Sequence, residues 1–435
     1  MNATLDPNLS LIESARALID NGQLSEAAAV LNRARQQIPK DPRVYMMAGL
    51  MSEKAGNAAG AFQLMQRGLE LAPNWAPGIV ELAHLQARQG QFAEAIENAA
   101  TAWELDAESR FVIDGAIHVA HLAGHRSLAV DRLRQALARY PGDTPWRLML
   151  ASDLSQLGQH EEALTLWDTL LAESPENLEA LEGRMHTLLA AGRLEEAATV
   201  TATLLALNPG NPVYAYYDAR AHGRTPAHQP AELNRQLFDS AAHVFDTQLV
   251  QGLRYQLPQQ IAQKILALYP DRKLRLLDLG CGTGLLGAQL GKIQGRLAGV
   301  DVSPKMLEQA RRLNLYDSLE VADLHDTLRT AAPASYDMIA ALDVCVYVGD
   351  LSDAIPAVWR TLVPGGLLAL SCESGSEDGP DLLLNPATER YVHKRSHVVA
   401  MCRATGFTVD VQETTLRYQA GQPVQGFVIF AHKPT

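Results

Sequence analysis

Residues 274–284 read LRLLDLGCGTG, an apolar run that leads directly into a glycine-rich turn. The run has the length and composition of a buried strand, and the apolar pattern after the turn is helical. Glycines in such a turn let a ligand approach the bare backbone, next to the free N–H groups that begin the following helix. The stretch therefore predicts a strand–turn–helix unit that binds a ligand, within a sheet of parallel strands.

Acidic residues accompany this turn and the next two predicted strands. Asp278 lies inside the first strand, where its carboxylate can reach a cationic amino group. Asp301 ends the apolar run 297–300, at the separation of roughly 20 residues that suits an acid binding ribose hydroxyls. Asp323 follows a third strand and offers a carboxylate to an exocyclic adenine amine, with Leu324 beside it for the adenine face. The order of these residues favours a cofactor that contains adenosine.

Two families share a turn of this kind. Gly282, Gly284 and Gly287 satisfy the dinucleotide pattern G-x-G-x-x-G, which admits a nicotinamide enzyme. Dinucleotide folds do not generally require an acid inside the first strand, however, and a later strand, 367–371, is preceded here by the residues VPGG. Together these features resemble the class I S-adenosylmethionine-dependent methyltransferases, over about residues 260–435.

That resemblance implies an α/β Rossmann-like domain with a mostly parallel seven-stranded sheet, and S-adenosyl-L-methionine as its cofactor. The family motif D-x-G-x-G-x-G holds the methionine part of the cofactor, and the later acids hold its ribose and adenine. No metal is expected, since the four cysteines are scattered singly. The residues implied for cofactor binding are Asp278, Gly280, Cys281, Gly282, Gly284, Asp301, Val302, Asp323, Leu324 and Asp343.

The first half of the chain repeats itself every 34 residues. A glycine, an alanine five residues later and a proline recur at this period, with Ala107 replacing the proline once. The glycine permits a tight turn between two helices, the alanine allows their close approach, and the proline ends the second helix. The recurring residues are Gly22, Gly56, Gly90, Gly124, Gly158 and Gly192; Ala27, Ala61, Ala95, Ala129, Ala163 and Ala197; and Pro39, Pro73, Pro141, Pro175 and Pro209.

This pattern resembles the tetratricopeptide repeat family over about residues 8–211, with 213–222 as a capping helix. The resemblance implies an all-α superhelical solenoid whose concave face binds a peptide or protein. The polar, proline-containing stretch 223–230 reads as a linker. We therefore expect a repeat domain at 1–222 and a methyltransferase domain at 231–435, an arrangement similar to bacterial methyltransferases fused to tetratricopeptide repeats.

Composition and charge exclude several other classes of protein. The 47% hydrophobic content is that of a globular protein, and no long apolar run predicts a membrane span or a secretory signal, so a cytoplasmic location is expected. Residues 1–220 hold 27 acidic against 17 basic side chains. An acidic surface disfavours nucleic acid and anionic membranes, which bind basic residues.

Catalytic candidates follow the fourth predicted strand, 338–342, where the substrate approaches in this family. Asp343 and Tyr347 should border the methyl group. His393 is the candidate base, because an imidazole titrates near neutral pH. A base is dispensable if the acceptor is a carboxylate or a neutral amine.

Substrate binding is expected from Arg390, Tyr391 and Arg417. An arginine can hold a carboxylate through two parallel hydrogen bonds. The segment 237–258 resembles the N-terminal cover helices of this group, and its aromatic residues are candidates for a lid over the cofactor. These are Phe238, Phe245 and Tyr255.

The primary hypothesis is a methyltransferase that modifies an oxygen or nitrogen of a peptide or protein recruited by the repeats. A first alternative is a small-molecule methyltransferase whose repeats serve assembly, including a homodimer. A second is a scaffold that binds the cofactor without catalysis. The sequence does not choose between oxygen and nitrogen as the acceptor.

Overall fold

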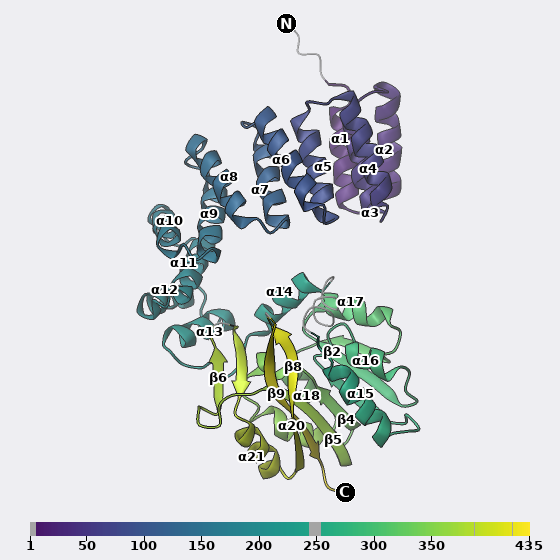
Figure 1. Cartoon of the computed structure of the whole chain (residues 1–435), viewed down its shortest axis with the longest axis vertical. Coiled ribbons are helices and arrows are strands. Elements are labelled where there is room, and N and C mark those ends of the chain that lie inside the picture. Colours follow the sequence, from purple (N-terminus) through teal and green to yellow (C-terminus); the bar gives the residue numbers. More distant parts are fainter. Residues whose placement is uncertain (1–5, 243–253, 387, 420) are drawn as a thin grey trace. The chain divides into compact units, whose positions relative to one another are not determined.

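The computed structural model describes residues 6–242, 254–386, 388–419 and 421–435, and the chain divides into two compact units, 1–193 and 194–435 (Figure 1). The first unit consists of helices that pack against their neighbours in sequence order as successive pairs. They are α1 (Leu9–Asp20), α2 (Leu24–Gln37), α3 (Pro42–Lys54), α4 (Ala58–Leu71), α5 (Ala76–Arg88), α6 (Phe92–Leu105), α7 (Arg110–Leu122), α8 (Arg126–Arg139), α9 (Thr144–Gln156), α10 (His160–Glu173) and α11 (Leu178–Ala190).

The periodic residues do what the repeat pattern predicts. The six repeat glycines all adopt a left-handed backbone with φ between 72° and 81°, a conformation that favours glycine. The six repeat alanines are fully buried, as close helix packing requires. Each repeat proline lies two residues beyond a helix end, as Pro39 does after α2. The first unit is thus a solenoid of helix pairs, which confirms the expected repeat architecture.

Among the described residues, the second unit has these helices before its first strand: α12 (Leu194–Leu207), α13 (Pro212–Ala221), α14 (Ala231–Ala241) and α15 (Leu257–Leu268). The sequence places the boundary at 223–230, but α13 belongs to the second compact unit. Its tyrosines Tyr214, Tyr216 and Tyr217 are buried, and Arg220 forms an ion pair with Glu389 at 2.6 Å. The repeat pattern, which extends to Pro209, therefore continues past residue 193, where the first compact unit ends.

The remainder of the second unit alternates strands and helices around one seven-stranded sheet. Its order is β3-β2-β1-β4-β5-β9-β8, in which the first five strands are parallel and β9 and β8 are antiparallel. The elements are β1 (Arg275–Leu279), α16 (Leu285–Leu290), β2 (Arg296–Asp301), α17 (Pro304–Arg312), β3 (Ser318–Val321), α18 (Leu324–Thr330), β4 (Tyr336–Ala341), α19 (Cys345–Val348), α20 (Ala354–Thr361), β5 (Leu362–Glu373), β6 (Leu382–Asn385), β7 (Arg390–His393), α21 (Arg395–Thr405), β8 (Thr408–Gln419) and β9 (Gln422–His432).

Both faces of this sheet are covered by helices. Leu277 and Leu279 of β1 pack into a core with residues of α18 to α21, whereas Leu276 packs into a second core with α15 and α16. Such alternation is expected of a strand buried on both sides. The fold is the mostly parallel α/β sheet that the sequence predicts. In the described ranges, no helix is both long and apolar enough to span a membrane.

Candidate functional site

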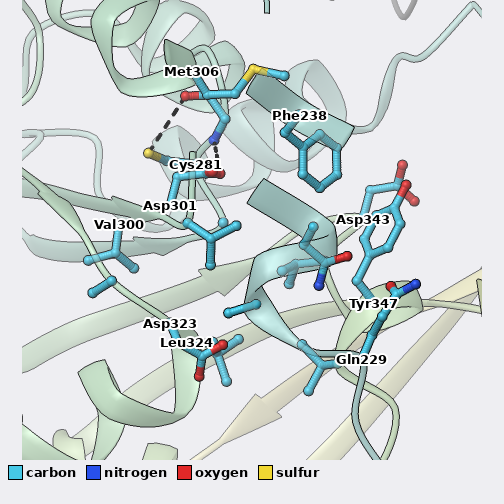
Figure 2. A pocket seen from close by; sticks show the side chains of 18 of the residues that line it. Gln229, Phe238, Cys281, Val300, Asp301, Met306, Asp323, Leu324, Asp343 and Tyr347 are labelled. Carbon is cyan, nitrogen blue, oxygen red and sulfur yellow. Dashed lines mark hydrogen bonds between the residues drawn. The ribbon is translucent and has the colours of Figure 1, made fainter. Parts of the chain in front are cut away.

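A cavity of about 450 Å³ lies at the carboxyl edge of the parallel strands, within the size range of small-molecule sites (Figure 2). Residues at or just after the ends of β1, β2, β3 and β4 line it: Gly280, Asp301, Ala322 and Leu342. This edge is where open parallel sheets bind ligands, because the turns there expose free backbone groups.

The glycine-rich turn after β1 is built so that only glycine fits. Gly280, Gly282 and Gly284 adopt positive φ of 67°, 53° and 89°. A Cβ atom on Gly280 would lie 2.7 Å from a methyl carbon of Val344, and one on Gly284 would lie 2.9 Å from Leu313. The turn therefore brings its backbone close to the cavity, which Cys281 and Thr283 of the same turn also line.

Asp278 lies below this turn and is 3% exposed. Burial raises its pKa to about 7; a hydrogen bond from Tyr316 opposes the rise and the nearby charge of Asp301 adds to it. The Tyr316 hydroxyl donates to Asp278 Oδ2 at 2.7 Å and accepts from the Gly287 N–H at 3.3 Å. Tyr316 thus links the acid to the helix that follows the turn.

The sequence analysis did not predict a role for Tyr316, although one feature of the sequence indicated a close contact there. Gly299 sits inside the apolar strand β2, and a Cβ there would lie 2.8 Å from the Tyr316 ring. A glycine within a strand often marks such a close approach. The sequence does not reveal which residue makes it.

Asp301 joins the turn to the second strand. Its Oδ2 accepts from the Gly282 N–H at 2.9 Å, and its Oδ1 accepts from the Ser303 N–H at 2.8 Å. Burial raises its pKa, and these backbone hydrogen bonds oppose the rise. Asp301 and Val302 both line the cavity, as does Cys281.

The third acid and its neighbours form another part of the wall. Asp323 accepts from the His325 N–H at 2.8 Å and thereby caps α18, while Asp323 and Leu324 both line the cavity. The sequence reasoning missed the histidine pair beside them. His228 and His325 meet edge to face with ring centroids 4.6 Å apart, and both line the cavity.

At the end of β4, Asp343 lies in the wall and is held from several directions. It has a left-handed φ of 56°, its N–H donates to Ser371 Oγ at 2.7 Å, and its Oδ1 accepts from Arg417 Nη1 at 2.8 Å. Arg417 is 1% exposed and also binds Glu373. Burial raises the pKa of Asp343, and the charges of Arg417 and Arg390 oppose the rise.

Tyr347 and Arg390 reach the cavity, as expected. Arg390 Nη2 donates to the Tyr347 hydroxyl at 3.1 Å. Phe238 packs edge to face on Tyr347 with centroids 5.1 Å apart (Figure 2). Phe238 and Tyr255, both expected lid residues, also line the cavity. The third, Phe245, lies outside the described residues.

The structure does not bring four other expected residues into the cavity wall: Gly284, Tyr391, His393 and Arg417. Residues alternate in direction along β7, so Tyr391 and His393 point away from the side that carries Arg390. His393 is 2% exposed, its Nε2 lies 2.7 Å from the Gly349 carbonyl oxygen, and burial lowers its pKa. Arg417 is engaged by carboxylates. We therefore do not propose His393 as the base, and Arg417 acts on the site by fixing Asp343.

Comparison with known families gives three matches. Residues 277–368 match a methyltransferase domain, and residues 12–74 and 154–221 match tetratricopeptide repeats. The methyltransferase match contains the glycine-rich turn and the acids Asp278, Asp301 and Asp323.

Curated relatives match over part of their length. The chain is 31% identical over 100 residues to the ubiquinone biosynthesis O-methyltransferase of Xanthomonas campestris pv. campestris (strain B100), covering 22% of this chain and 42% of that protein. It is 30% identical over 101 residues to the enzyme of the same name from Thiobacillus denitrificans, covering 22% and 43%. The chain thus spans about two fifths of the length of these relatives.

Two solved structures each align with about half of the chain. Magnesium protoporphyrin IX methyltransferase from Synechocystis PCC 6803, with bound SAH, aligns at 20% identity and a TM-score of 0.37, covering 47% of this chain and 99% of that one. PilF of Pseudomonas aeruginosa aligns at 16% identity and a TM-score of 0.38, covering 48% and 96%.

Proposed function

Since this chain joins tetratricopeptide repeats to a methyltransferase domain, we propose that it is an S-adenosylmethionine-dependent methyltransferase acting on a peptide or protein held by the repeats. The observation that carries the proposal is the cavity at the carboxyl edge of the sheet. A bare glycine turn and the three acids Asp278, Asp301 and Asp323 meet there.

The residues present fit this cofactor. The turn at Gly280 to Gly284 leaves backbone for the methionine part, with Asp278 beneath it as a partner for the ammonium group. Asp301 keeps oxygen lone pairs beyond its two backbone hydrogen bonds, and these suit ribose hydroxyls. Asp323 and Leu324 supply an acceptor and an apolar surface for adenine.

The cofactor supplies a methyl group on a sulfonium sulfur, which is already activated toward nucleophiles. The protein then has to align the acceptor and exclude water. Phe238 and Tyr347 provide an aromatic wall beside Asp343. Arg417 fixes Asp343 so that its carboxylate can accept a hydrogen bond from an acceptor hydroxyl or amine, and this contact orients the acceptor.

The repeats support a macromolecular acceptor, because solenoids of this type present extended binding surfaces and raise the local concentration of a bound target. A second candidate is methylation of a small molecule, with the repeats serving assembly. The names of the ubiquinone O-methyltransferases, and a cavity of small-molecule size, favour it. Both candidates share the same cofactor site.

Calorimetric titration with S-adenosylmethionine and S-adenosylhomocysteine tests the shared site. We expect micromolar binding, about −8 kcal/mol. Asp301→Ala should reduce affinity at least tenfold, because it removes the ribose acceptor and frees the Gly282 N–H. Asp378→Ala, at an exposed position of the same unit, is the control. A folded wild-type chain that binds neither compound would refute the proposal.

A further inference from the structure

A junction segment, residues 223–241, connects α13 to the methyltransferase domain and precedes the region matched to that family. The start of this segment is attached to the domain through two neighbouring residues. The Ala227 carbonyl accepts from the Asp350 N–H at 2.8 Å, and His228 Nδ1 lies 2.8 Å from the Val348 carbonyl oxygen. The attachment is close: a Cβ on Gly349 would lie 2.1 Å from the Ala227 oxygen.

The far end of the junction segment is attached as well. Asp239 of α14 accepts from Ser303 Oγ at 2.6 Å, and Ser303 is hydrogen-bonded through its N–H to Asp301. Phe238 packs on Tyr347, as Figure 2 shows. The segment is therefore fixed beside both the ribose acid and the acceptor end of the cavity.

One face of the segment forms part of the cavity wall. Asn234 and Phe238 are four residues apart and so share a face of α14, and Pro230 directly precedes the helix; all three line the cavity. Asn234 is 8% exposed, and its Oδ1 is buried without a hydrogen-bond partner within the part of the chain that the structure describes. Gln229 also lines the cavity, and its Oε1 is likewise buried without a hydrogen-bond partner among the described residues.

A buried amide oxygen without a partner is unfavourable, and native proteins rarely leave one. Water or a ligand with an N–H or O–H group can satisfy it. The proposed cofactor carries such donors along its whole length: an adenine amine, two ribose hydroxyls and an ammonium group. Asn234 lines the same cavity as the histidine pair and Phe238, which makes the cofactor the fitting partner.

We propose that the junction segment completes the cofactor site, with Asn234 accepting a hydrogen bond from S-adenosylmethionine. This rests on the proposed function and extends it. The connection between the repeats and the catalytic domain then takes part in ligand binding, and a domain cut at the start of the matched region would lack a wall of its own pocket.

The test uses the full-length chain and two alanine variants of α14. Asn234→Ala removes the unpaired oxygen, and Gln236→Ala removes an exposed amide from the same helix as a matched control. S-adenosylhomocysteine binding is measured by calorimetry, and melting temperature is measured with and without that compound. We expect Asn234→Ala to weaken binding about tenfold, as for a lost hydrogen bond, and Gln236→Ala to leave it unchanged.

The melting temperatures separate a binding role from a structural one. Because Asn234 Oδ1 is unpaired without ligand, Asn234→Ala should leave the melting temperature of the free protein unchanged or raise it, while reducing the increase on adding S-adenosylhomocysteine. A lower melting temperature of the free variant would show a structural role and overturn the inference.

Two other outcomes would also overturn it. Equal binding by wild type and Asn234→Ala would assign the oxygen to another ligand, such as the methyl acceptor, and would leave the proposed function standing. Failure of the wild-type chain to bind would remove the proposed function together with the inference that rests on it.

Discussion

The surroundings of Asp278 raise the pKa of its carboxyl group to near neutral pH. Burial raises its pKa from 3.8 to about 7, although Tyr316 donates a hydrogen bond to it. A raised pKa means that the folded protein binds more protons than the unfolded chain between these two values. Ionisation of Asp278 therefore lowers the stability of the free protein as pH rises through this window.

The same group should make cofactor binding depend on pH in the opposite direction. Ionised Asp278 attracts the ammonium group of the ligand, so affinity for S-adenosylhomocysteine should rise as pH increases through about 7. Between pH 5.5 and 7.5, we expect a gain of roughly 20-fold. Calorimetry across this range measures it, and a flat profile would contradict the assigned role.

A matched pair of variants attributes the midpoint to Asp278. Tyr316→Phe removes the hydrogen bond that favours the ionised form, so the midpoint should move above 7. Tyr269→Phe is the control, because both tyrosines pack on the same apolar cluster. An equal response of the two variants would assign the pH dependence to another group.

At the scale of the elements, each repeat hairpin turns at a glycine in the left-handed conformation. Gly124 has a φ of +72° and open space around the position of a Cβ. Any cost of adding a methyl group there is therefore a backbone cost and not a clash.

Substitution of this glycine should destabilise the first unit. We expect Gly124→Ala to cost about 1 kcal/mol. Gly142→Ala is the control: that site is equally open but lies outside the left-handed region, so the change should be neutral or stabilise by about 0.4–1 kcal/mol. Thermal unfolding of the two variants gives the comparison. Similar melting temperatures would contradict the argument from backbone conformation.

At the scale of the whole molecule, the two compact units divide the work. Every residue that lines the cavity lies between Pro212 and Arg390, inside the second unit. The buried tyrosines of α13 and the pair of Arg220 with Glu389 also belong to that unit. Under the proposed function, the repeat helices of the first unit would hold the acceptor.

Two truncations test this division. A chain without residues 1–193 should bind S-adenosylhomocysteine within about threefold of wild type but lose methyl transfer to a protein acceptor. Deleting residues 1–222 also removes α13, so the melting temperature of that truncated chain should be lower than that of the chain without residues 1–193. Labelled methyl donor in cell lysate measures the transfer. Full methylation of the protein acceptor by the chain without residues 1–193 would reject docking by the repeats and favour the small-molecule candidate.

Much of the site was predictable because its signals are local. The strand, the turn and the acids after successive strands all follow from short stretches, and parallel strands bring their carboxyl ends to one edge. The side of β7 that faces the cavity was not predictable. Arg390, Tyr391 and His393 looked like equal candidates in sequence, yet strand alternation placed Arg390 in the wall and His393 behind it.

The sequence by itself determined the solenoid of 34-residue repeats, the mostly parallel sheet and the glycine turn, because turn conformation and apolar periodicity act over a few residues. Only the tertiary structure decided the partners of the charged and polar groups. Tyr316 reaches Asp278 across 38 residues, and Arg417 reaches Asp343 across 74. Such pairs arise from sheet order and burial, which together set both the distance between groups and the energy of leaving one unpaired.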